Sequence, residues 1–280
     1  MKFCGIFFHG WRCLGPPVIL RSRRLAAVSK DYKYIASFRF HGVLNDFLPP
    51  ERRHRVTRYP FDGHPGIKDP IEALGVPHSE VARILVDGRA VDFSYRLQDN
   101  NQVEAYSLGP TGFDLTNPAL RPPLAKPSRF VVDVNLGKLA RWLRLLGFDT
   151  AWRNDYSDRQ VVEKAVAEQR VILTRDRRLL FHRIIDYGFW VRAVEPLLQT
   201  REVLDRMALW HEIHPFRYCL ECNGLIKPVS KKAVLKQLEP LTRRYYDEFY
   251  RCSCCHRIYW KGSHYAKLLQ KLGDLEGGVN

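Results

Sequence analysis

The sequence predicts an α/β protein whose central part is a parallel sheet covered by helices, with a smaller α+β domain before it and a metal-binding module after it. Between residues 129 and 180, two short apolar runs alternate with two amphipathic helical patterns, an order typical of a parallel sheet. Between residues 33 and 109, alternating apolar and polar residues predict short strands around one helical segment. Two Cys-x-x-Cys pairs near the C-terminus predict a metal site. The 280 residues have room for two or three such domains.

The central stretch organises the rest of the chain. It opens with the apolar run Phe130–Val132, which predicts a buried strand, and continues into Leu136–Leu146, where leucine and alanine recur at helical spacing before Gly147 ends the helix. Asp158–Gln169 predicts a second helix and Val171–Leu173 a second buried strand. A further strand and helix are expected to extend the sheet at Gly188–Val194 and Pro196–Leu209.

Aspartates follow both predicted strands. Asp133 ends the first strand and Asp176 follows the second, and the carboxyl ends of parallel strands meet at one edge, where open α/β sheets bind ligands. Two carboxylates there can hold magnesium or manganese, which prefer oxygen ligands and activate a bound water against a phosphodiester. Asp158 and Asp155, at the start of the second helix, are candidates for the third and fourth ligands. Asp158 could equally serve only as the N-cap of its helix.

The central stretch resembles a known family, the PIN-like ribonucleases named after the Mut-seven C-terminal domain. The resemblance rests on three segments, FVVDVNLGKLARWLRLLGFDT, DRQVVEKA and RVILTRDRRLL. It extends from Phe130 to about Trp260. It implies a PIN-like nuclease fold over residues 129–214 and the activity of a metal-dependent ribonuclease.

The resemblance also implies roles for individual residues. In this family the aspartate that ends the first strand and the aspartate of the TRD motif bind the catalytic metal, which assigns these roles to Asp133 and Asp176, with Asp158 as the acid before the second helix. Arg177 and Arg178 stand where the wider PIN pattern has a further acid. The number of metal ions, one or two, therefore stays open.

The net charge of +15 and the isoelectric point near 9.6 point to a polyanionic partner. Scattered lysine and arginine usually form a solvated surface, but an excess this large favours nucleic acid, with RNA implied by the family resemblance. No apolar run approaches the roughly 20 residues needed to span a bilayer. We therefore expect a soluble, cytoplasmic protein with no membrane partner.

The N-terminal part of the chain predicts a β-grasp (ubiquitin-like) domain. Residues 1–30 hold six Lys or Arg and no acid, and we expect residues 1–32 to be a disordered leader. Residues 33–109 show the order strand–strand–helix–strand–strand, and Asp87-Gly88 predicts a hairpin turn. Residues 110–128 are rich in proline and predict a stiff linker.

This domain resembles sulfur-carrier proteins in the segment ILVDGRAVDFSYRLQDNNQVEAYSL. Sulfur carriers act through a free C-terminal Gly-Gly, whereas this chain continues beyond Leu108-Gly109. Sulfur transfer is therefore not expected, and a module that binds a protein partner or positions the nuclease is the preferred interpretation. Ubiquitin-like domains of this kind also occur fused ahead of the ribonuclease domain described above.

Basic residues flank the predicted metal site. Lys138, Arg141 and Arg144 recur three residues apart on the first helix, and Arg175 and Arg177 surround the aspartate of the TRD motif. Charges at this spacing are more often a solvated helix face. Their place directly after a candidate metal ligand favours contact with the phosphates beside the cleaved bond.

The cysteines predict a zinc ribbon over residues 215–272, followed by a tail over 273–280. Cys219 and Cys222 form one Cys-x-x-Cys knuckle, and Cys252 and Cys255 form another after 29 intervening residues, which include a predicted helix. Four thiolates suit tetrahedral structural zinc, with disulfides as the alternative. Cys254 is an extra thiol inside the second knuckle.

The region around the last knuckle also predicts RNA contact. Residues 217–271 hold 12 Lys or Arg against four Asp or Glu. Tyr259, Trp260 and His264 could face RNA, where stacking on aromatic rings tolerates any base, although core packing of Trp260 is an equal alternative.

Together these observations predict a ribonuclease that acts on RNA, with tRNA or rRNA suggested by the family resemblance alone. The alternative is a non-catalytic RNA- or ribosome-binding protein with a degenerate nuclease fold. A third interpretation makes the β-grasp domain a recruiter of a partner protein.

Overall fold

The computed structural model describes residues 32–107, residue 120 and residues 126–276. From Lys33 onward these residues belong to one compact unit. The leader predicted for residues 1–32, except Tyr32, and most of the linker predicted for residues 110–128 lie outside the described residues. None of the described helices is long and apolar enough to cross a membrane.

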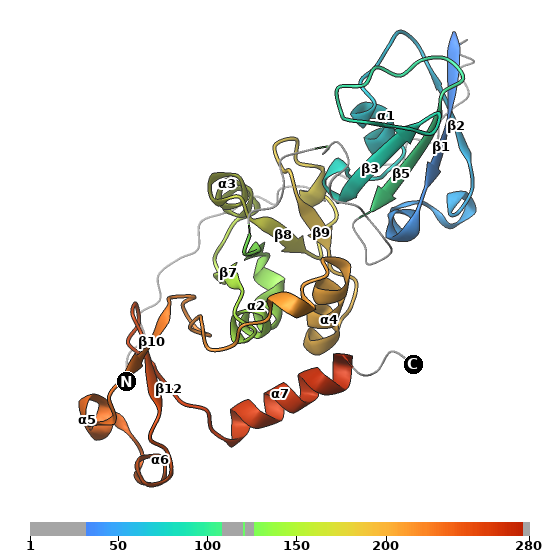
Figure 1. The fold of residues 1–280 in the computed structure, drawn as a ribbon. Coiled ribbons are helices and arrows are strands. Elements are labelled where there is room, and N and C mark those ends of the chain that lie inside the picture. The colour runs from blue at the N-terminus through green and yellow to red at the C-terminus, as the bar shows by residue number, and fades with distance from the viewer. Residues whose placement is uncertain (1–31, 108–119, 121–125, 277–280) are drawn as a thin grey trace, which may run out of the picture. The chain divides into compact units, whose positions relative to one another are not determined.

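The N-terminal module is a five-stranded mixed sheet with the order β2-β1-β5-β3-β4 (Figure 1). Strands β1 and β5 are parallel, and the other neighbours are antiparallel. This is the predicted β-grasp arrangement. Its elements are β1 (Tyr34–Phe40), β2 (Thr57–Phe61), α1 (Lys68–Ala73), β3 (Val81–Val86), β4 (Arg89–Val91) and β5 (Gln102–Ser107), with the 3₁₀ turns η1 (Gly42–Phe47), η2 (Pro50–Arg52) and η3 (His78–Glu80).

The alternating pattern of β1 places one face of that strand in the core. Phe38 is fully buried, as is Ile71 of α1 in the same cluster. Asp87 and Gly88 both have positive φ, 50° and 78°, and join β3 to β4. Positive φ at both central residues is what a two-residue hairpin turn requires, which confirms the turn predicted from Asp-Gly.

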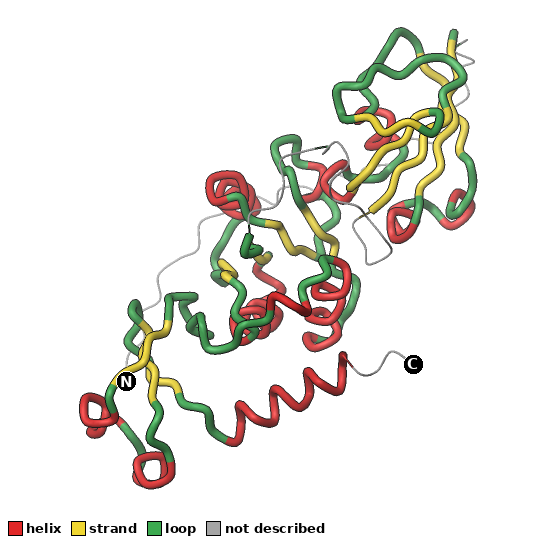
Figure 2. The backbone as a smooth tube through the Cα atoms, viewed as in Figure 1, coloured by secondary structure: helices red, strands yellow, loops and turns green. Residues whose placement is uncertain are grey.

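The central module is a four-stranded, fully parallel sheet with the order β7-β6-β8-β9. Figure 2 shows its strands in yellow among the red helices of this module. Its elements are β6 (Arg129–Val132), α2 (Gly137–Leu145), β7 (Asp149–Ala151), α3 (Asp158–Glu168), β8 (Val171–Thr174), β9 (Gly188–Trp190) and α4 (Pro196–Arg206), with the 3₁₀ turns η4 (Val134–Leu136), η5 (Leu179–Phe181) and η6 (Trp210–Glu212). The predicted parallel α/β sheet is confirmed.

Helices cover both faces of this sheet. Phe130 and Leu173 face a cluster that includes α2 and α4, whereas Val131 and Ile172 face a cluster that includes α3. Successive residues of a strand point to opposite faces, so a strand buried on both sides is apolar at every position. This explains why these strands appear in the sequence as continuous apolar runs.

Two details of the sheet differ from expectation. The edge strand β7 was not predicted, because the sequence Asp149–Ala151 has neither alternation nor an apolar run; it forms by pairing with β6. Strand β9 ends at Trp190 rather than at Val194, because its ladder with β8 ends where Thr174 pairs with Trp190.

Gly147 lies directly after the C-cap of α2, as predicted for the end of that helix. It has φ 93°, and a Cβ there would lie 1.9 Å from the carbonyl oxygen of His214.

The C-terminal module is a small three-stranded antiparallel sheet with the order β10-β11-β12. The helix expected between the knuckles is present as a short helix that continues into a 3₁₀ turn. The region expected to be a tail starts inside a helix that continues to Glu276. The elements are β10 (Ile226–Val229), α5 (Lys231–Val234), η7 (Leu235–Gln237), α6 (Pro240–Tyr245), β11 (Phe249–Cys252), β12 (Ile258–Tyr259) and α7 (Ser263–Glu276).

Turn η3 of the β-grasp module packs against strand β9. The carboxylate of Glu80 accepts the N–H of Trp190 at 2.5 Å and pairs with the guanidinium of Arg206 at 2.7 Å. Glu80 and Arg206 are only 2% and 8% exposed. The hydroxyl of Ser79 donates to the carbonyl of Leu180, which is buried in the core cluster of the β-grasp module. The N-terminal module therefore covers the β9 edge of the central sheet.

Candidate active site and metal centre

Asp133 and Asp176 lie beyond the carboxyl ends of neighbouring strands, and one threonine links them. The hydroxyl of Thr174, the last residue of β8, donates to Oδ2 of Asp133 at 2.9 Å. The same hydroxyl oxygen accepts the backbone N–H of Asp176, also at 2.9 Å. The N–H of Asp133 donates to Leu173, which extends the β6–β8 ladder by one residue. A single hydroxyl thus sets the position of the two predicted ligands relative to each other.

The two carboxylates have different surroundings. Asp133 is only 5% exposed, because it lies at the end of a strand covered on both faces. Asp176 is exposed, and its Oδ1 accepts the N–H of Arg178 at 2.8 Å, a short aspartate turn that holds the side chain beside its own loop. One carboxylate is therefore fixed and buried, and the other is open to solvent.

Asp158 and Asp155 remain on the surface. The N-cap of α3 is Ser157, whose hydroxyl accepts from the N–H of Gln160 in a capping box, so the alternative that Asp158 caps the helix is wrong. Asp158 is the exposed first residue of the helix. Both carboxylate oxygens of Asp155 are bonded to Arg153, at 2.8 and 2.7 Å, and this hydrogen bonding holds the pKa of Asp155 below its ordinary value.

The predicted carboxylate ligands do not converge as a set. Across the described ranges, one group of three or more His, Cys, Asp or Glu side chains brings its ligand atoms together, and that group is the four cysteines. The structure links Asp133 with Asp176 through Thr174 and leaves Asp158 and Asp155 outside this link.

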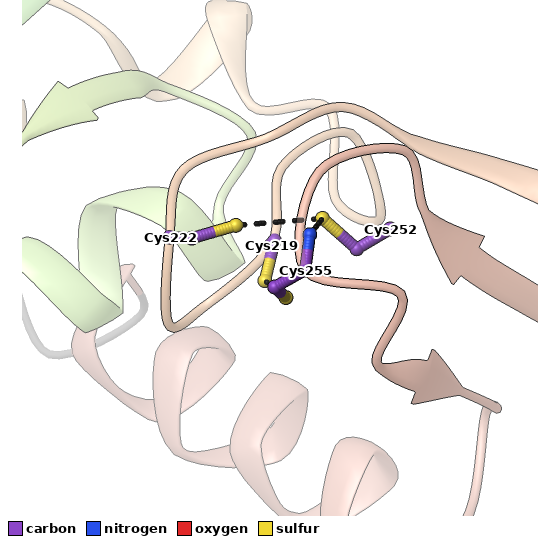
Figure 3. Close-up of side chains that lie close together, drawn as sticks. All are labelled: Cys219, Cys222, Cys252 and Cys255. Atoms are coloured by element: carbon purple, nitrogen blue, oxygen red, sulfur yellow. Dashed lines mark hydrogen bonds between the residues drawn. The ribbon is translucent and has the colours of Figure 1, made fainter.

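The four predicted zinc ligands, Cys219, Cys222, Cys252 and Cys255, do converge (Figure 3). All four sulfur atoms lie within 4.8 Å of one another. The Cys222–Cys252 and Cys219–Cys255 sulfur atoms are 3.4 and 3.5 Å apart. Around a tetrahedral zinc with Zn–S bonds of about 2.3 Å, the sulfur atoms are about 3.8 Å apart. The cluster therefore has the donor set and the size for one zinc ion.

The backbone around the cluster is shaped to fit thiolates. The N–H groups of Cys254 and Cys255 both point at the sulfur of Cys252, at 3.4 Å. A Cβ at Gly224 would lie 2.9 Å from that sulfur and 2.8 Å from the Cβ of Cys254, so a side chain there would displace a ligand. Burial raises the pKa of the Cys222 thiol, so a bound cation is needed to ionise all four together.

Tyr259 supports the cluster from outside. Its hydroxyl donates to the sulfur of Cys219 at 3.0 Å and accepts the N–H of Leu220 at 3.2 Å. Burial opposes ionisation of Cys219, but hydrogen bonds from Tyr259 and from the N–H groups of Cys222 and Glu221 lower the pKa of this thiol to about 7. A partner that orients a ligand in this way is typical of built metal sites.

Arg144 joins the central module to the first knuckle, and the prediction that it contacts RNA is wrong. The side chain is 2% exposed. Its Nε donates to the carbonyl of Thr150 at 2.9 Å, and its Nη1 donates to the carbonyls of Leu220 and Glu221 at 2.9 and 2.8 Å. These donors hold together α2, β7 and the knuckle, so the guanidinium lies inside the protein.

A second tie between these modules uses an asparagine. Asn223 has φ 64°, a conformation that asparagine tolerates, and its Oδ1 accepts the N–H of Thr150 at 2.9 Å. Its Nδ2 donates to the carboxylate of Asp149 at 2.6 Å. The side-chain amide of Asn223 therefore bonds one backbone N–H and one side-chain carboxylate of β7.

The other predicted RNA contacts differ in exposure. Lys138 is exposed, and Arg141 is exposed but forms an ion pair with Glu221 at 2.5 Å. Arg175 is exposed while its Nη1 donates to a backbone carbonyl at 3.3 Å. Arg177 is partly buried and donates to the carbonyl of Phe47 in the β-grasp module at 2.7 Å.

Trp260 and His264 lie near the end of the ribbon. Trp260 is 37% exposed, with its ring centroid 6.4 Å from that of Tyr246 and 6.5 Å from that of Phe249. The ring thus packs within the module and keeps one part open. His264 belongs to α7, and its side chain lies outside the described residues.

Sequence reasoning did not predict the roles that three residues, Thr174, Asn223 and Tyr259, have at these sites. Thr174 stands in the TRD motif, directly after the predicted strand Val171–Leu173, and Asn223 directly follows a predicted zinc ligand. Both are short polar side chains next to a chemically important residue, which is a usable signal. The link from Tyr259 to Cys219 spans 40 residues and required the fold.

Comparisons with known proteins agree with these observations. A family model described as the Mut7-C RNAse domain matches residues 128–272, and a second one, described as Mut7-C ubiquitin, matches residues 33–109. Neither the search of curated proteins nor the search of solved structures found a match. The matched regions contain the Asp133–Thr174–Asp176 link, the cysteine cluster and the β-grasp module.

Proposed function

Because the chain belongs to the Mut7-C RNAse domain family, we propose that it is a metal-dependent ribonuclease that hydrolyses RNA phosphodiester bonds. The proposal assigns residues 129–214 to a PIN-like nuclease domain, 215–272 to a zinc ribbon and 33–109 to a ubiquitin-like domain that also offers a surface for a protein partner. Structured RNA such as tRNA or rRNA is the proposed class of substrate.

Asp133 and Asp176, with Asp158 as a third ligand, would hold magnesium or manganese. Such an ion supplies an activated water and neutralises charge on the scissile phosphate. In this arrangement the hydrogen bond from the hydroxyl of Thr174 to Oδ2 of Asp133 would fix the orientation of the Asp133 carboxylate.

Basic side chains would bind the flanking phosphates. Lys138 begins the helix that follows the buried aspartate, and Arg175 lies next to Asp176 in the chain; both are exposed. Positive charge in these places would position the RNA and offset the negative charge that develops during hydrolysis.

The observation that carries the proposal is the Asp133–Thr174–Asp176 link. It joins two carboxylates at the carboxyl edge of a parallel sheet, where open α/β sheets bind ligands, within the region that matches the ribonuclease family.

We also propose that the four cysteines hold one structural zinc ion. Their sulfur atoms, the N–H groups aimed at Cys252 and the close approach of Gly224 fit this ion. The zinc would stabilise the ribbon and, through Arg144 and Asn223, its attachment to the nuclease domain.

A second candidate function is RNA or ribosome binding without cleavage. The exposed positions of Asp158 and Asp155, outside the Asp133–Thr174–Asp176 link, favour it. Both functions fit the net charge of +15, so only a test of chemistry separates them.

The test compares the full-length wild type with an Asp133→Asn/Asp176→Asn variant on end-labelled tRNA and rRNA, in manganese, in magnesium and in EDTA. Asp69→Asn, an exposed aspartate of the β-grasp module, is the matched control. We expect cleavage by the wild type and the control in metal, and none by the double variant or in EDTA. Binding without cleavage in every condition would favour the second candidate, and cleavage that survives the double substitution would refute the assigned site.

A further inference from the structure

A basic run in the β-grasp module, ERRHR at residues 51–55, is not explained by the fold. Arg52, Arg53 and Arg55 are exposed, with Glu51 as the acidic residue of the run. Exposed runs of this kind usually lie in solvated loops with no fixed shape. Here the loop is held in place from the inside.

Asn45 fixes the loop that carries this run. The side chain is only 2% exposed. Its Nδ2 donates to the carbonyls of Phe40 and Gly42 at 2.8 and 3.1 Å, and its Oδ1 accepts the N–H of His54 at 2.7 Å. His54 has φ 58°, so the chain makes a sharp, pinned turn in the middle of the basic run. The arginines are therefore displayed from a defined support.

Guanidinium groups from both modules gather on one short segment of η1 and the residues after it. The carbonyl of Phe47 accepts from Nη2 of Arg177 at 2.7 Å, and the carbonyl of the next residue, Leu48, accepts from Nε of Arg53 at 3.0 Å. Arg192 donates to the carbonyl of Val43 at 3.1 Å. Arg53 and Arg177, which are far apart in the sequence, are thus held on the carbonyls of two adjacent residues, and Arg192 is held a few residues earlier in the same segment.

The aromatic side chains of this segment help to hold the cluster. The guanidinium carbon of Arg177 lies 4.9 Å from the ring centroids of both Phe47 and Trp190, and that of Arg192 lies 4.7 Å from Trp190. Such cation–π contacts fix the direction of a guanidinium while leaving hydrogen-bond donors available. Arg177 directly follows Asp176, so the cluster adjoins the proposed active site.

The positive charge of this cluster is only partly compensated. Arg192 pairs with Asp46 at 2.8 Å and lies 3.6 Å from Glu202. Arg177 and Arg53 donate to the carbonyls of the adjacent residues Phe47 and Leu48, at 2.7 and 3.0 Å. Like charges held this close repel one another, and a bound polyanion would relieve that repulsion.

We propose that Arg52, Arg53 and Arg55 of the β-grasp domain form, together with Arg177, one cationic surface beside Asp176 that binds the phosphate backbone of the RNA substrate. The ubiquitin-like domain then contributes directly to RNA binding, in addition to any protein partner. This inference rests on the proposed function, because it takes RNA as the ligand.

The test measures binding in EDTA, where metal-dependent cleavage cannot occur. Labelled oligouridylate and labelled bulk tRNA are titrated with full-length wild type, with Arg52→Gln/Arg55→Gln, and with Arg89→Gln/Arg96→Gln. The last variant removes the same charge from other exposed positions of the same domain. The side chains of Arg52 and Arg55 are exposed, and neither is needed for the bonds that hold the loop, so both variants should keep the thermal unfolding midpoint of the wild type.

Each phosphate contact to a single strand contributes about 0.7 to the slope of log K against log salt. Loss of two contacts should therefore make the slope for oligouridylate shallower by about 1.4 and weaken binding roughly 25-fold at 0.1 M salt. The control variant should match the wild type. An unchanged slope in Arg52→Gln/Arg55→Gln, equal weakening in both variants, or wild type that binds neither RNA would overturn the inference.

These outcomes are distinct from failure of the proposed nuclease activity. If the wild type binds RNA with the expected slope difference but never cleaves it in metal, the cationic surface stands and the catalytic assignment falls. If cleavage is metal-dependent and the salt slope of Arg52→Gln/Arg55→Gln equals that of the wild type, the catalytic assignment stands and the cationic surface is refuted.

Discussion

The hydroxyl of Thr174 donates a hydrogen bond to the carboxylate of Asp133 across 2.9 Å, at a position where both residues are buried. A hydrogen-bonded carboxylate has one fixed orientation, which a metal site requires of its ligands. We expect Thr174→Val to weaken manganese binding about 10- to 100-fold, a range typical for loss of such a supporting partner.

Thr174→Ser is the matched variant, because it keeps the hydroxyl and removes one methyl group. It should retain most of the manganese affinity, measured by electron paramagnetic resonance of the free ion, and most of the activity. Equal loss in both variants would mean that packing of the methyl group, and not the hydrogen bond, is what matters.

Arg144 should contribute to stability and not to RNA affinity. Its replacement by alanine removes the donor to the buried carbonyl of Thr150 and to the partly buried carbonyls of Leu220 and Glu221, and opens a gap between α2 and the first knuckle. A buried carbonyl left without a donor costs on the order of 1–3 kcal/mol, so we expect the free energy of unfolding in urea to fall by about 2 kcal/mol. Lys138→Ala, in an exposed position on the same helix, should leave stability within about 0.5 kcal/mol and weaken RNA binding instead.

Removal of the proposed zinc should unfold the ribbon and weaken its attachment to the nuclease domain. We expect Cys222→Ser, or treatment with a strong chelator, to release one equivalent of zinc and lower the thermal unfolding midpoint. Cys254→Ser should keep the metal, because Cys254 lies outside the group of four converging sulfur atoms. Zinc content by atomic absorption and unfolding by circular dichroism provide both readouts, and full zinc in Cys222→Ser would refute the assignment.

Asp149 should make the free energy of unfolding depend on pH in the acidic range. Burial raises its pKa, but hydrogen bonds from Arg170 and Asn223 outweigh this effect and leave the pKa below the ordinary value of 3.8. A group whose pKa is lowered on folding stabilises the protein above its unfolded pKa, and this contribution is lost as the pH falls through the folded pKa. Unfolding by urea between pH 6 and about pH 3 should therefore show a steeper loss in the wild type than in Asp149→Asn. A parallel decline in both proteins would contradict this role.

The sequence predicted the parts of the fold that have strong local patterns. The buried strand at Phe130–Val132 and the helix that ends before Gly147 are apparent from the apolar runs and from the glycine alone. Strand β7 could not be predicted, because three polar and small residues become a strand only when β6 lies beside them. Local sequence patterns predict elements whose own residues favour the structure, but not elements that form only by pairing with a neighbouring strand.

The candidate sites divide in the same way. The cysteine spacing predicted four ligands that the structure brings together, because a knuckle is a local motif. The basic stripe was harder to interpret, since Lys138 and Arg144 look alike in sequence but one is exposed and the other is buried under carbonyls of a distant segment. Burial by a segment 76 residues away leaves no trace in local spacing.

The contact of Glu80 with β9 has a consequence for how the protein can be divided. A fragment that began at residue 129 would present the N–H of Trp190 on an open sheet edge, where other chains can pair and aggregate. It would also carry Arg206 with its buried counter-ion removed. A fragment of residues 33–109 would in turn lose Leu180 from its core. Either module alone is therefore expected to unfold at a lower temperature and to aggregate more readily than the full-length protein.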